Sequence, residues 1–566
     1  MARLIKLVAG IGLIALLIGG GWWLAERRSV HSDEAPLVGT LRTEPETFNR
    51  LVTASAAVDA ITPLIHAPLI KVDRTTGTLM PWLAERWDTL SETSYRLHLR
   101  HNVRFSDGDD FTSDDVVFTF RALYDERVNS ALASGLTVDG RPLSVTAEGP
   151  HVVRIDFPSA YGPGLAMLDV LPMLPRHRLE AALDGGRFAE AWAASAPAET
   201  IAGLGPFKVE QVRAGESITF TRNPHYFRSD DQGALPRAAT LIVRVVPDQS
   251  AEIVQLESGA ADFGTSGLRA EDIAAFRALE QQGRVRLHDV GIALDPNALW
   301  FNLRPGATAA EDRPWLQSLE LRQAISRAVS RQRVIDTVFL GAAHPVVTPV
   351  TPGHGAWHAA DVMPHAYDPA EGARLLERVG LRDRDGNGIR EDAAGREARF
   401  TLLTQRGHTI RERMAAIVQD DMRKVGVAVD VVPLEVGSLI ARIGGGDYDA
   451  VLFGLQASAV DPALNLDFWL PGGVFHFWHP SQVTPVNAWE ARIASLMDRV
   501  TRATDQNERH RSFHEVQRIF AEHLPAIYFA APRVIVATSA RLDGVAPSVL
   551  QPHLLWQPEL LRIVKR

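Results

Sequence analysis

The sequence of 566 residues contains no cysteine. This absence excludes disulfide bonds, cysteine-ligated zinc, iron–sulfur clusters and thiol catalysis, and it also excludes a lipid-modified N-terminal cysteine. Long runs of one charge sign, internal repeats and low-complexity tracts are missing as well. The formal net charge is −9, from 59 Lys+Arg and 68 Asp+Glu, and the basic residues are dispersed. Because nucleic-acid binding leaves a basic footprint, we expect no nucleic-acid partner.

Recognisable catalytic motifs are also missing. The sequence has no phosphate loop, no GxSxG elbow, no HExxH and no GxGxxG between a strand and a helix. His476 and His479 lie three residues apart in FHFWHP without a nearby acidic third ligand, which favours an aromatic cluster over a metal site. Asp114 and Asp115 follow Ser113 at the start of an apolar helical pattern, which favours helix capping over acid–base catalysis. We therefore expect no enzyme activity, no cofactor and no metal.

What the chain does contain is a mixed α/β pattern of ordinary globular composition, with 46% hydrophobic residues. Residues 95–99 alternate apolar and polar side chains, as in a half-buried strand, and residues 218–220 and 241–246 are strand-like as well. Apolar residues at helical spacing predict helices over 321–329 and 410–425. At roughly 100–200 residues per domain, the length predicts about three or four domains or lobes.

The N-terminus carries an uncharged run of nineteen residues, Leu7 to Ala25, between Arg3 and Lys6 on one side and Glu26–Arg28 on the other. A helix of that length spans about 28 Å, close to the ~30 Å hydrocarbon thickness of a bilayer. We favour an uncleaved transmembrane signal anchor over residues 1–28. The alternative is a signal peptide cleaved after Ser32, although the run is longer than a usual signal-peptide core.

The polar segment 381–395, LRDRDGNGIREDAAG, imitates the start of an EF-hand loop through Asp383, Asp385, Asn387 and Gly388. The twelfth loop position, where calcium loops carry a bidentate Glu, is Ala394. The sequence therefore favours a tight Asp/Asn/Gly turn over a calcium site.

Four segments, in order along the chain, resemble one family. The stretch 84–120 contains Ala84, Glu85 and Trp87, then VRFSDG, then TSDDV; the other three are GLGPFKVEQVRAGESITFTRNPHYF (203–227), LRQAISRAVSRQRVIDTVFLGAAHPVVTPV (321–350) and YDPAEGARLLERVGLRDRDGNG (367–388). Together they are similar to the extracytoplasmic solute-binding proteins of family 5, which serve peptide and nickel ABC transporters. The resemblance covers about residues 36–560.

The resemblance implies an α/β, two-lobed, periplasmic-binding-protein-like fold of type II, in the large cluster with an inserted subdomain. The expected boundaries are lobe I over 36–75, 200–290 and 520–566, an inserted subdomain over 76–199, and lobe II over 291–519. Two crossings, near Asp295 and near Glu515, would form the hinge about which the lobes close on a ligand.

Ligand contacts are expected from loops that line the interlobe cleft: 43–49, 404–408, 454–461 and 475–478. The candidate ligand-binding residues are Glu44, Phe48, Arg406, His408, Gln456, Ser458 and Trp478. The resemblance further implies that an acidic residue shortly before Asp461-Pro462 receives a peptide α-amine. That position here is Ser458, so a free peptide N-terminus is not the expected ligand group, and Asp461 is expected to cap the next helix.

The implied function is that of the substrate-binding component of an ABC importer. It would capture a peptide-like solute and deliver it to a permease and its ATPase. We expect a monomer in the periplasm or at the extracytoplasmic face of the inner membrane, held by the N-terminal helix rather than by a lipid. The alternative is a membrane-anchored solute sensor or scaffold that uses the same fold without transport.

Overall fold

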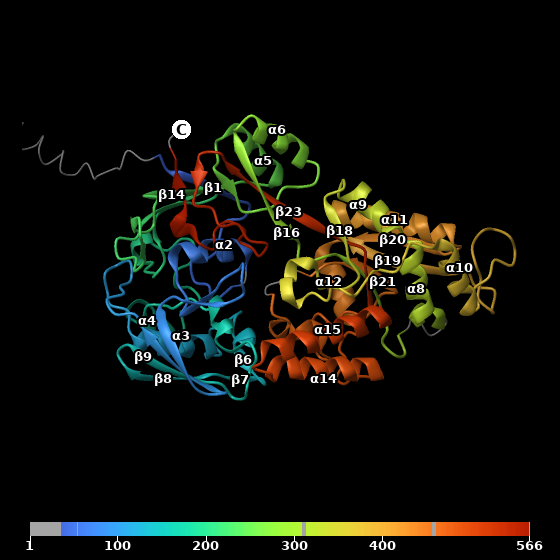
Figure 1. Ribbon diagram of the computed structural model, residues 1–566, viewed down its shortest axis with the longest axis horizontal. Helices are drawn as coiled ribbons and strands as arrows, with labels where there is room; N and C mark the ends of the chain where they lie inside the picture. Colours follow the sequence, from blue (N-terminus) through green and yellow to red (C-terminus); the bar gives the residue numbers. More distant parts are fainter. Residues whose placement is uncertain (1–34, 54, 308–312, 456–459, 565–566) are drawn as a thin grey trace, which may run out of the picture.

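The computed structural model describes residues 35–53, 55–307, 313–455 and 460–564, arranged as two bodies joined by crossing strands (Figure 1). The expected membrane anchor over residues 1–28 lies outside these residues. Among the helices of the described part, none is both long and apolar enough to span a bilayer.

The first body is built on an eight-stranded sheet of order β10-β11-β14-β1-β15-β23-β16, in which β18 also pairs with β23. Its strands are β1 (Leu37–Leu41), β10 (Phe207–Arg213), β11 (Ser217–Arg222), β14 (Thr240–Val245), β15 (Phe263–Gly264), β16 (Val285–Ile292), β18 (Ala343–Pro345) and β23 (Ala530–Ser539). The helices packed on it are α2 (Ala56–Ile65), α5 (Gln249–Ser258) and α6 (Ile273–Gln281). These bounds confirm the strands expected at 218–220 and 241–246.

Strand β1 is buried along its whole length and serves two cores. Leu37 and Leu41 join the large core beneath α2, whereas Val38 packs with α5 and α6 on the other face. Gly39 is required between them, because a Cβ there would lie 2.5 Å from the ring of Phe263. Alternate side chains of β1 thus point to opposite faces of the sheet.

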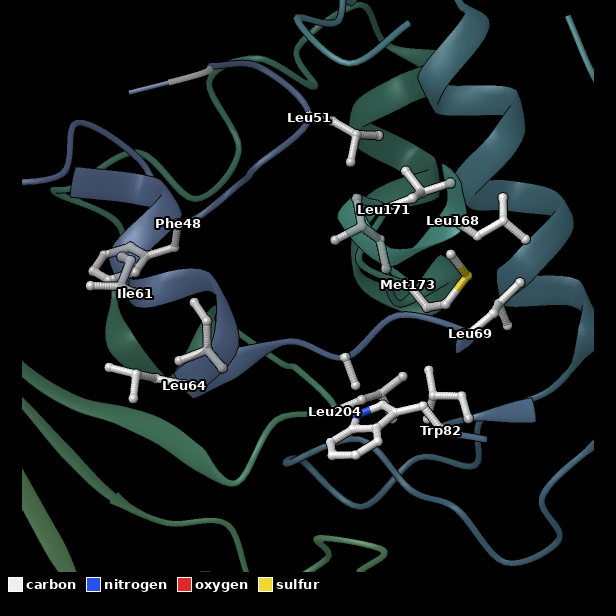
Figure 2. Packing of buried hydrophobic residues seen from close by; sticks show 14 of the residues in the cluster. Phe48, Leu51, Ile61, Leu64, Leu69, Trp82, Leu168, Leu171, Met173 and Leu204 are labelled. Carbon is white, nitrogen blue, oxygen red and sulfur yellow. The ribbon is translucent and has the colours of Figure 1, made fainter. Parts of the chain in front are cut away.

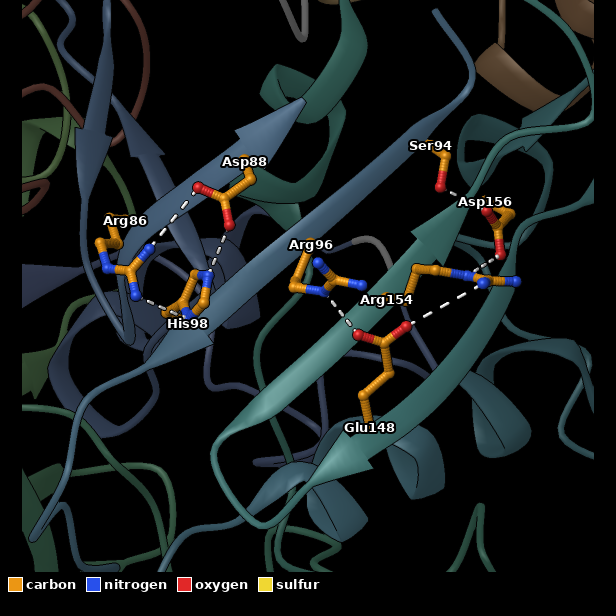
Figure 3. A network of polar contacts seen from close by, with 8 residues as sticks. All are labelled: Arg86, Asp88, Ser94, Arg96, His98, Glu148, Arg154 and Asp156. Carbon is orange, nitrogen blue, oxygen red and sulfur yellow. Dashed lines mark hydrogen bonds and ion pairs between the residues drawn. The ribbon is translucent and has the colours of Figure 1, made fainter. Parts of the chain in front are cut away.

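The inserted segment forms a four-stranded antiparallel sheet of order β4-β5-β9-β8, covered by α3 (Ser113–Tyr124), against which α4 (Arg176–Asp184) packs. Its strands are β4 (Ala84–Ser91), β5 (Ser94–Leu99), β8 (Ser144–Gly149) and β9 (Val152–Asp156). Leu97 and Leu99 point into the core, as the alternation predicts. The outer face carries cross-strand charge pairs, among them Arg96 to Glu148 at 2.6 Å (Figure 3). Apolar packing thus accounts for one face of this sheet, and charge pairs between strands account for the other.

Helix α3 begins as the sequence predicts. Thr112 is its N-cap, and Asp115 completes a capping box by accepting from the Thr112 backbone N–H at 2.9 Å. The other oxygen of the same carboxylate accepts from the Arg176 backbone N–H at 2.9 Å. Burial raises the pKa of Asp115, and these backbone donors oppose the rise. The carboxylate therefore ties α3 to α4 and is explained by capping.

The second body has a five-stranded sheet of order β20-β19-β21-β17-β22. The strands are β17 (Ala298–Phe301), β19 (Arg399–Gln405), β20 (Ala428–Leu434), β21 (Ala450–Phe453) and β22 (Ala526–Tyr528). Its helices are α8 (Leu319–Ala328), α9 (Arg331–Val338), α10 (Pro369–Arg378), α11 (Thr409–Lys424), α12 (Val436–Gly445), α13 (Leu466–Trp469), α14 (Ala488–Arg502) and α15 (Gln506–His523). Helices α8 and α11 confirm the two helical patterns.

Alternate side chains of strand β17 pack into the two cores of this body. Leu299 and Phe301 pack with α8 and α11, whereas Trp300 lies on the other face with α14 and α15. Trp300 stacks on Trp478 with ring centroids 6.1 Å apart and planes 3° from parallel. Residues 476–478 of the aromatic run are thus core structure in this body, whereas Phe475 is exposed.

Smaller elements complete the described chain. The two-stranded pairs are β2 (Ile70–Val72) with β3 (Leu79–Pro81), β6 (Thr137–Val138) with β7 (Arg141–Pro142), β12 (Ser229–Asp230) with β13 (Gly233–Ala234), and β24 (Leu542–Asp543) with β25 (Arg562–Ile563). They lie in or beside the first body and its insertion (Figure 1).

Two strand-to-strand connections link the two sheets directly, and β18, between α9 and α10 of the second body, also pairs with β23 of the first sheet. The first crossing, residues 293–297, joins β16 to β17, where the crossing near Asp295 is expected. The second lies at Phe529, between β22 of the five-stranded sheet and β23 of the eight-stranded one. The expectation of a crossing near Glu515 differs from this, because Phe513, Val516 and Phe520 of α15 pack in the core of the second body.

Candidate functional site

Both crossings leave the second body from one edge of its sheet. Parallel strands β19 and β21 have their carboxyl ends there, and the antiparallel register sets Ala298 opposite both Phe453 and Tyr528. Ligands of α/β proteins bind outside the carboxyl ends of parallel strands. The hinge edge, which we define as residues 293–297, 405–411 and 453–454, is therefore the candidate functional site.

Arg411 lies at the centre of the hinge edge, in the first turns of α11. Its Nε donates to Asn297 Oδ1 at 2.8 Å, and its Nη1 donates to Gln405 Oε1 at 2.6 Å. Its Nη2 donates to the Gly454 carbonyl at 3.2 Å, and the guanidinium lies 4.1 Å from the ring centroid of Phe453. One side chain thus joins the first crossing to the ends of β19 and β21.

The electrostatics of the hinge edge are those of a partly desolvated cation with an acid beside it. Burial lowers the pKa of Arg411 to about 10, although the charge of Asp295 opposes this change. Asp295 is solvent-accessible, yet the surrounding protein desolvates its carboxyl group and raises its pKa to about 6, an effect that Arg411 opposes. The pKa of His408 is lowered by burial and by Arg411. Because Arg411 uses neutral oxygens for its three hydrogen bonds, it retains its charge for an anionic group.

A second contact joins the inserted segment to the second body. The Gly162 backbone N–H donates to the Thr501 carbonyl at 2.5 Å, and the Tyr161 hydroxyl donates to the Ala463 carbonyl at 3.4 Å. Arg502 pairs with Asp139 at 3.3 Å. Figure 1 shows β6 and β7 against the end of α14, away from the crossing strands β16 and β23. We call these residues the distal contact.

Asp461 lies beside the distal contact and is already neutralised. It accepts from the Ala463 backbone N–H at 3.0 Å and so caps the following short helix, as the sequence predicts. Arg509, which is 1% exposed, donates through Nη2 to both Asp461 oxygens, at 2.6 and 2.7 Å. The carboxylate is therefore committed to a buried partner.

Of the candidate residues predicted from the sequence, some lie on loops and others lie in the hydrophobic cores. Glu44 follows β1 and accepts from the Gly215 backbone N–H at 2.9 Å. Arg406 and His408 follow β19, but Arg406 turns outward to the Pro433 carbonyl and Glu435. Phe48 is 1% exposed in the first core, beside Ile61 and Leu64 (Figure 2).

Trp478 is likewise 1% exposed, in the core of the second body, and its indole N–H donates to Glu490 at 3.3 Å. His476 is buried against Trp478 with centroids 3.8 Å apart, and burial lowers its pKa to about 4, in agreement with an aromatic cluster. Phe48 and Trp478 therefore pack as core residues in this conformation. Gln456 and Ser458 lie outside the described residues.

Arg411 is the residue that sequence reasoning missed, although a signal was present. It stands three, seven and eleven residues before Met414, Val418 and Met422, all of which are buried. This spacing puts the arginine on the core-facing side of α11, where a charged residue is unusual. Arg406 precedes the helix and has no such constraint.

A surface hollow of about 500 Å³ lies at the other end of β19, lined by Arg313, Arg399, Asp430 and Asp449 among others. Its charges are matched internally: Arg313 pairs with Asp449 at 3.0 Å and Arg399 with Asp430 at 2.8 Å. Glu397 also lines the hollow and pairs with Arg399 at 2.9 Å, so both arginines are already paired with carboxylates. Unlike the hinge edge, this hollow therefore suits an anionic ligand poorly.

Two α/β bodies, two crossings and a charged hinge edge define the class of two-lobed solute-binding proteins. The family model "Bacterial extracellular solute-binding proteins, family 5 Middle" matches residues 78–476. The chain belongs to this family, whose members are binding proteins of the extracytoplasmic space.

Relatives and solved structures agree with this assignment. A dipeptide-binding protein of Pseudomonas aeruginosa is 26% identical over 514 residues, which cover 87% of this chain and 88% of that protein. A nickel-binding periplasmic protein of Escherichia coli is 28% identical over 407 residues, 70% and 71% of the two chains. The fold is shared with the oligopeptide-binding protein AppA of Bacillus subtilis, solved with a nonapeptide, at TM-score 0.70, 24% identity and coverage of 94% and 99%.

Proposed function

We propose that this chain is the substrate-binding component of an ABC importer and that it captures a peptide-like solute between its lobes. The observation that carries the proposal is Arg411, a half-buried cation at the edge from which both crossings leave. Closure would bury the solute and present a closed surface to a permease and its ATPase. The family membership and the peptide-binding relatives support this function.

The ligand group that this site suits best is a carboxylate or another planar anion, because an arginine fork binds such groups bidentately. For this contact we propose Arg411 rather than Arg406, which turns outward to Glu435. A free α-amine is a poorer match, since Asp461 is neutralised by Arg509. We therefore propose a peptide-like solute recognised through its carboxylate, with Glu44, Gln456, Ser458 and His408 as further candidate contacts.

Membrane attachment belongs to the proposal as well. The apolar run Leu7–Ala25 would hold the protein at the extracytoplasmic face of the membrane, since the sequence has no cysteine for a lipid anchor. The same run favours a second candidate, a membrane-anchored solute sensor or scaffold. Adjacent permease and ATPase genes would favour transport, and adjacent signalling genes would favour sensing. Intact-mass measurement of the exported protein decides whether the run is retained.

The test begins with native mass spectrometry of the full chain to detect a co-purifying solute, followed by thermal-shift screening of peptides. A solute that binds the folded state must raise the unfolding temperature by linkage. Arg411→Gln should then weaken binding by about 10- to 100-fold, because a hydrogen bond to a charged group contributes about 1.5–3 kcal/mol.

Arg406→Gln is the matched control, since Arg406 lies in the same loop region but is exposed. Its affinity should stay within about threefold of the parent, as expected for an exposed charge. A larger loss in Arg406→Gln than in Arg411→Gln would remove Arg411 from the proposal. The absence of stabilisation by any peptide, metal chelate or sugar would remove the receptor function.

A further inference from the structure

The loop between α10 and β19 gathers three carboxylates that the solute site does not use. One oxygen from each of Asp383, Asp385 and Glu391 lies within 4.8 Å of the others. Asp383 and Asp385 are exposed, whereas Glu391 is 6% exposed. The loop packs at the amino end of β19, where the Arg390 backbone N–H donates to the Gly426 carbonyl at 2.8 Å. It therefore lies away from the hinge edge.

The three carboxylates converge without a cation to offset their charge. Among the described residues, none of the three forms an ion pair with Lys, Arg or His, although the loop itself contains several arginines. The guanidinium of Arg384 donates to the backbone carbonyls of Glu391 and Asp392, and that of Arg390 donates to the carbonyls of Val425 and Leu381. Like charges this close repel unless a positive ion lies between them.

Glu391 supplies the independent sign of a ligand. Its Oε2 accepts from the Arg384 backbone N–H at 2.8 Å, whereas its Oε1 is buried and finds no hydrogen-bond partner among the residues that the structure describes. A buried carboxylate oxygen without a donor is costly, and metal coordination is one of the few arrangements that satisfies it. Glu391 is thus both the most buried carboxylate of the cluster and the one with an oxygen, Oε1, that lacks a hydrogen-bond donor among the described residues.

From these observations we propose that Asp383, Asp385 and Glu391 hold a calcium ion. All three donors are carboxylate oxygens, the ligands that hard divalent cations take. Numbered from Asp383, they occupy loop positions one, three and nine, and Asn387 and Ile389 occupy positions five and seven. Because position twelve lacks a bidentate Glu, the sequence alone favours a tight turn over a calcium site. The structure instead brings Glu391, at position nine, to the other two.

Calcium is favoured over magnesium because the loop offers separated, partly exposed oxygens rather than a tight octahedron. Without the bidentate ligand, the dissociation constant should fall in the range of weak extracellular calcium sites, about 10⁻⁴–10⁻³ M. The bound ion would fix the connection between α10 and β19 of the second sheet. Its expected role is to stabilise this body rather than to bind the solute.

The test is calorimetric titration of the chelator-treated full chain with CaCl₂, together with thermal unfolding at constant ionic strength. The parent should bind one calcium ion and unfold several degrees higher in 10 mM CaCl₂. Asp385→Asn should lose at least tenfold in calcium affinity, and Glu391→Gln should abolish the thermal shift. Asp336→Asn is the matched control, because Asp336 is exposed on α9 and accepts only from Gln332 at 2.8 Å.

Several results would overturn the proposal. One is a parent that shows neither heat nor thermal shift up to 10 mM CaCl₂. Another is an Asp385→Asn variant that keeps the parent's response, and a third is an equal response to MgCl₂. Because Asp385 is exposed, its substitution leaves the core intact, so a failure to fold cannot imitate the expected loss. The solute-binding assay at the hinge edge is independent of all these outcomes.

Discussion

Gly162 at the distal contact allows a direct test of whether this contact holds the lobes together. A Cβ at this position would lie 2.5 Å from Arg509 Nε, 2.6 Å from the Ala503 carbonyl oxygen and 2.9 Å from the Val500 carbonyl oxygen. Two of these three atoms are backbone, so they cannot turn away. Gly162→Ala should therefore separate the inserted segment from the second body.

The magnitude follows from the overlap. Adding a methyl group to a filled site costs about 1–3 kcal/mol, and the Gly162–Thr501 hydrogen bond adds to this if it is lost. The contact joins two bodies, so the strain can be relieved by opening rather than by unfolding. The closed-to-open ratio should then fall by about 5- to 140-fold, at 1.4 kcal/mol per factor of ten. Solute affinity would weaken with the population of the closed form.

Single-molecule energy transfer measures this ratio, and the cysteine-free sequence makes the labelling specific. Thr146→Cys on β8 and Ser495→Cys on α14 introduce the only two thiols, both at exposed positions. Gly149→Ala is the control, because a Cβ there meets no atom within 4 Å. If Gly162→Ala and Gly149→Ala gave the same distribution of transfer efficiency, the distal contact would not control closure.

Two further predictions concern the hinge edge and the ligand amine. Because the pKa of Asp295 is raised from 3.8 to about 6, the folded state holds this proton more tightly than the unfolded chain. The contribution of Asp295 to stability should be fully present below about pH 4 and be lost as the pH rises through about 6. The difference in stability between the parent and Asp295→Asn should therefore change between pH 4 and 7 in urea titrations, and a difference that is independent of pH would contradict the assignment. A peptide ligand and its N-acetylated form should bind within about threefold of each other, since Asp461 is committed to Arg509; a large loss on acetylation, measured by calorimetry, would reveal another carboxylate partner.

Much of the secondary structure could be predicted because an element with one buried face has apolar residues at a regular spacing in the sequence. The alternation in residues 95–99 reflects a strand with one buried face, and the spacing from Met414 to Met422 reflects a helix with one. The second crossing could not be found in this way. Residues 526–539 read as one strand-like stretch, and only the pairing partners show that the sheet changes at Phe529.

The sequence predicts part of the candidate region. The expected loop 404–408 overlaps the hinge edge because it follows the carboxyl end of β19, which is parallel to β21. The expected loop 43–49 follows β1 of the other sheet and is not part of the hinge edge. Side-chain direction does not follow from loop membership. Phe48 and Trp478 lie in such segments yet turn into the cores, where burying an aromatic ring is most favourable.

The contacts around the two crossings suggest how binding of an anion to Arg411 would affect both lobes. The two crossings are joined to each other, since the Ala293 backbone N–H donates to the Pro532 carbonyl at 2.9 Å. Strand β18, which lies between α9 and α10 of the second body, joins the first sheet by pairing with β23 from Ala530 to Pro532, so we expect rotation in the short ribbon beyond these residues. Arg411 contacts Asn297 at the root of that ribbon. Under the proposed function, an anion that draws Arg411 toward itself would pull on the first crossing through Asn297, which would link solute binding to the proposed closure of the lobes.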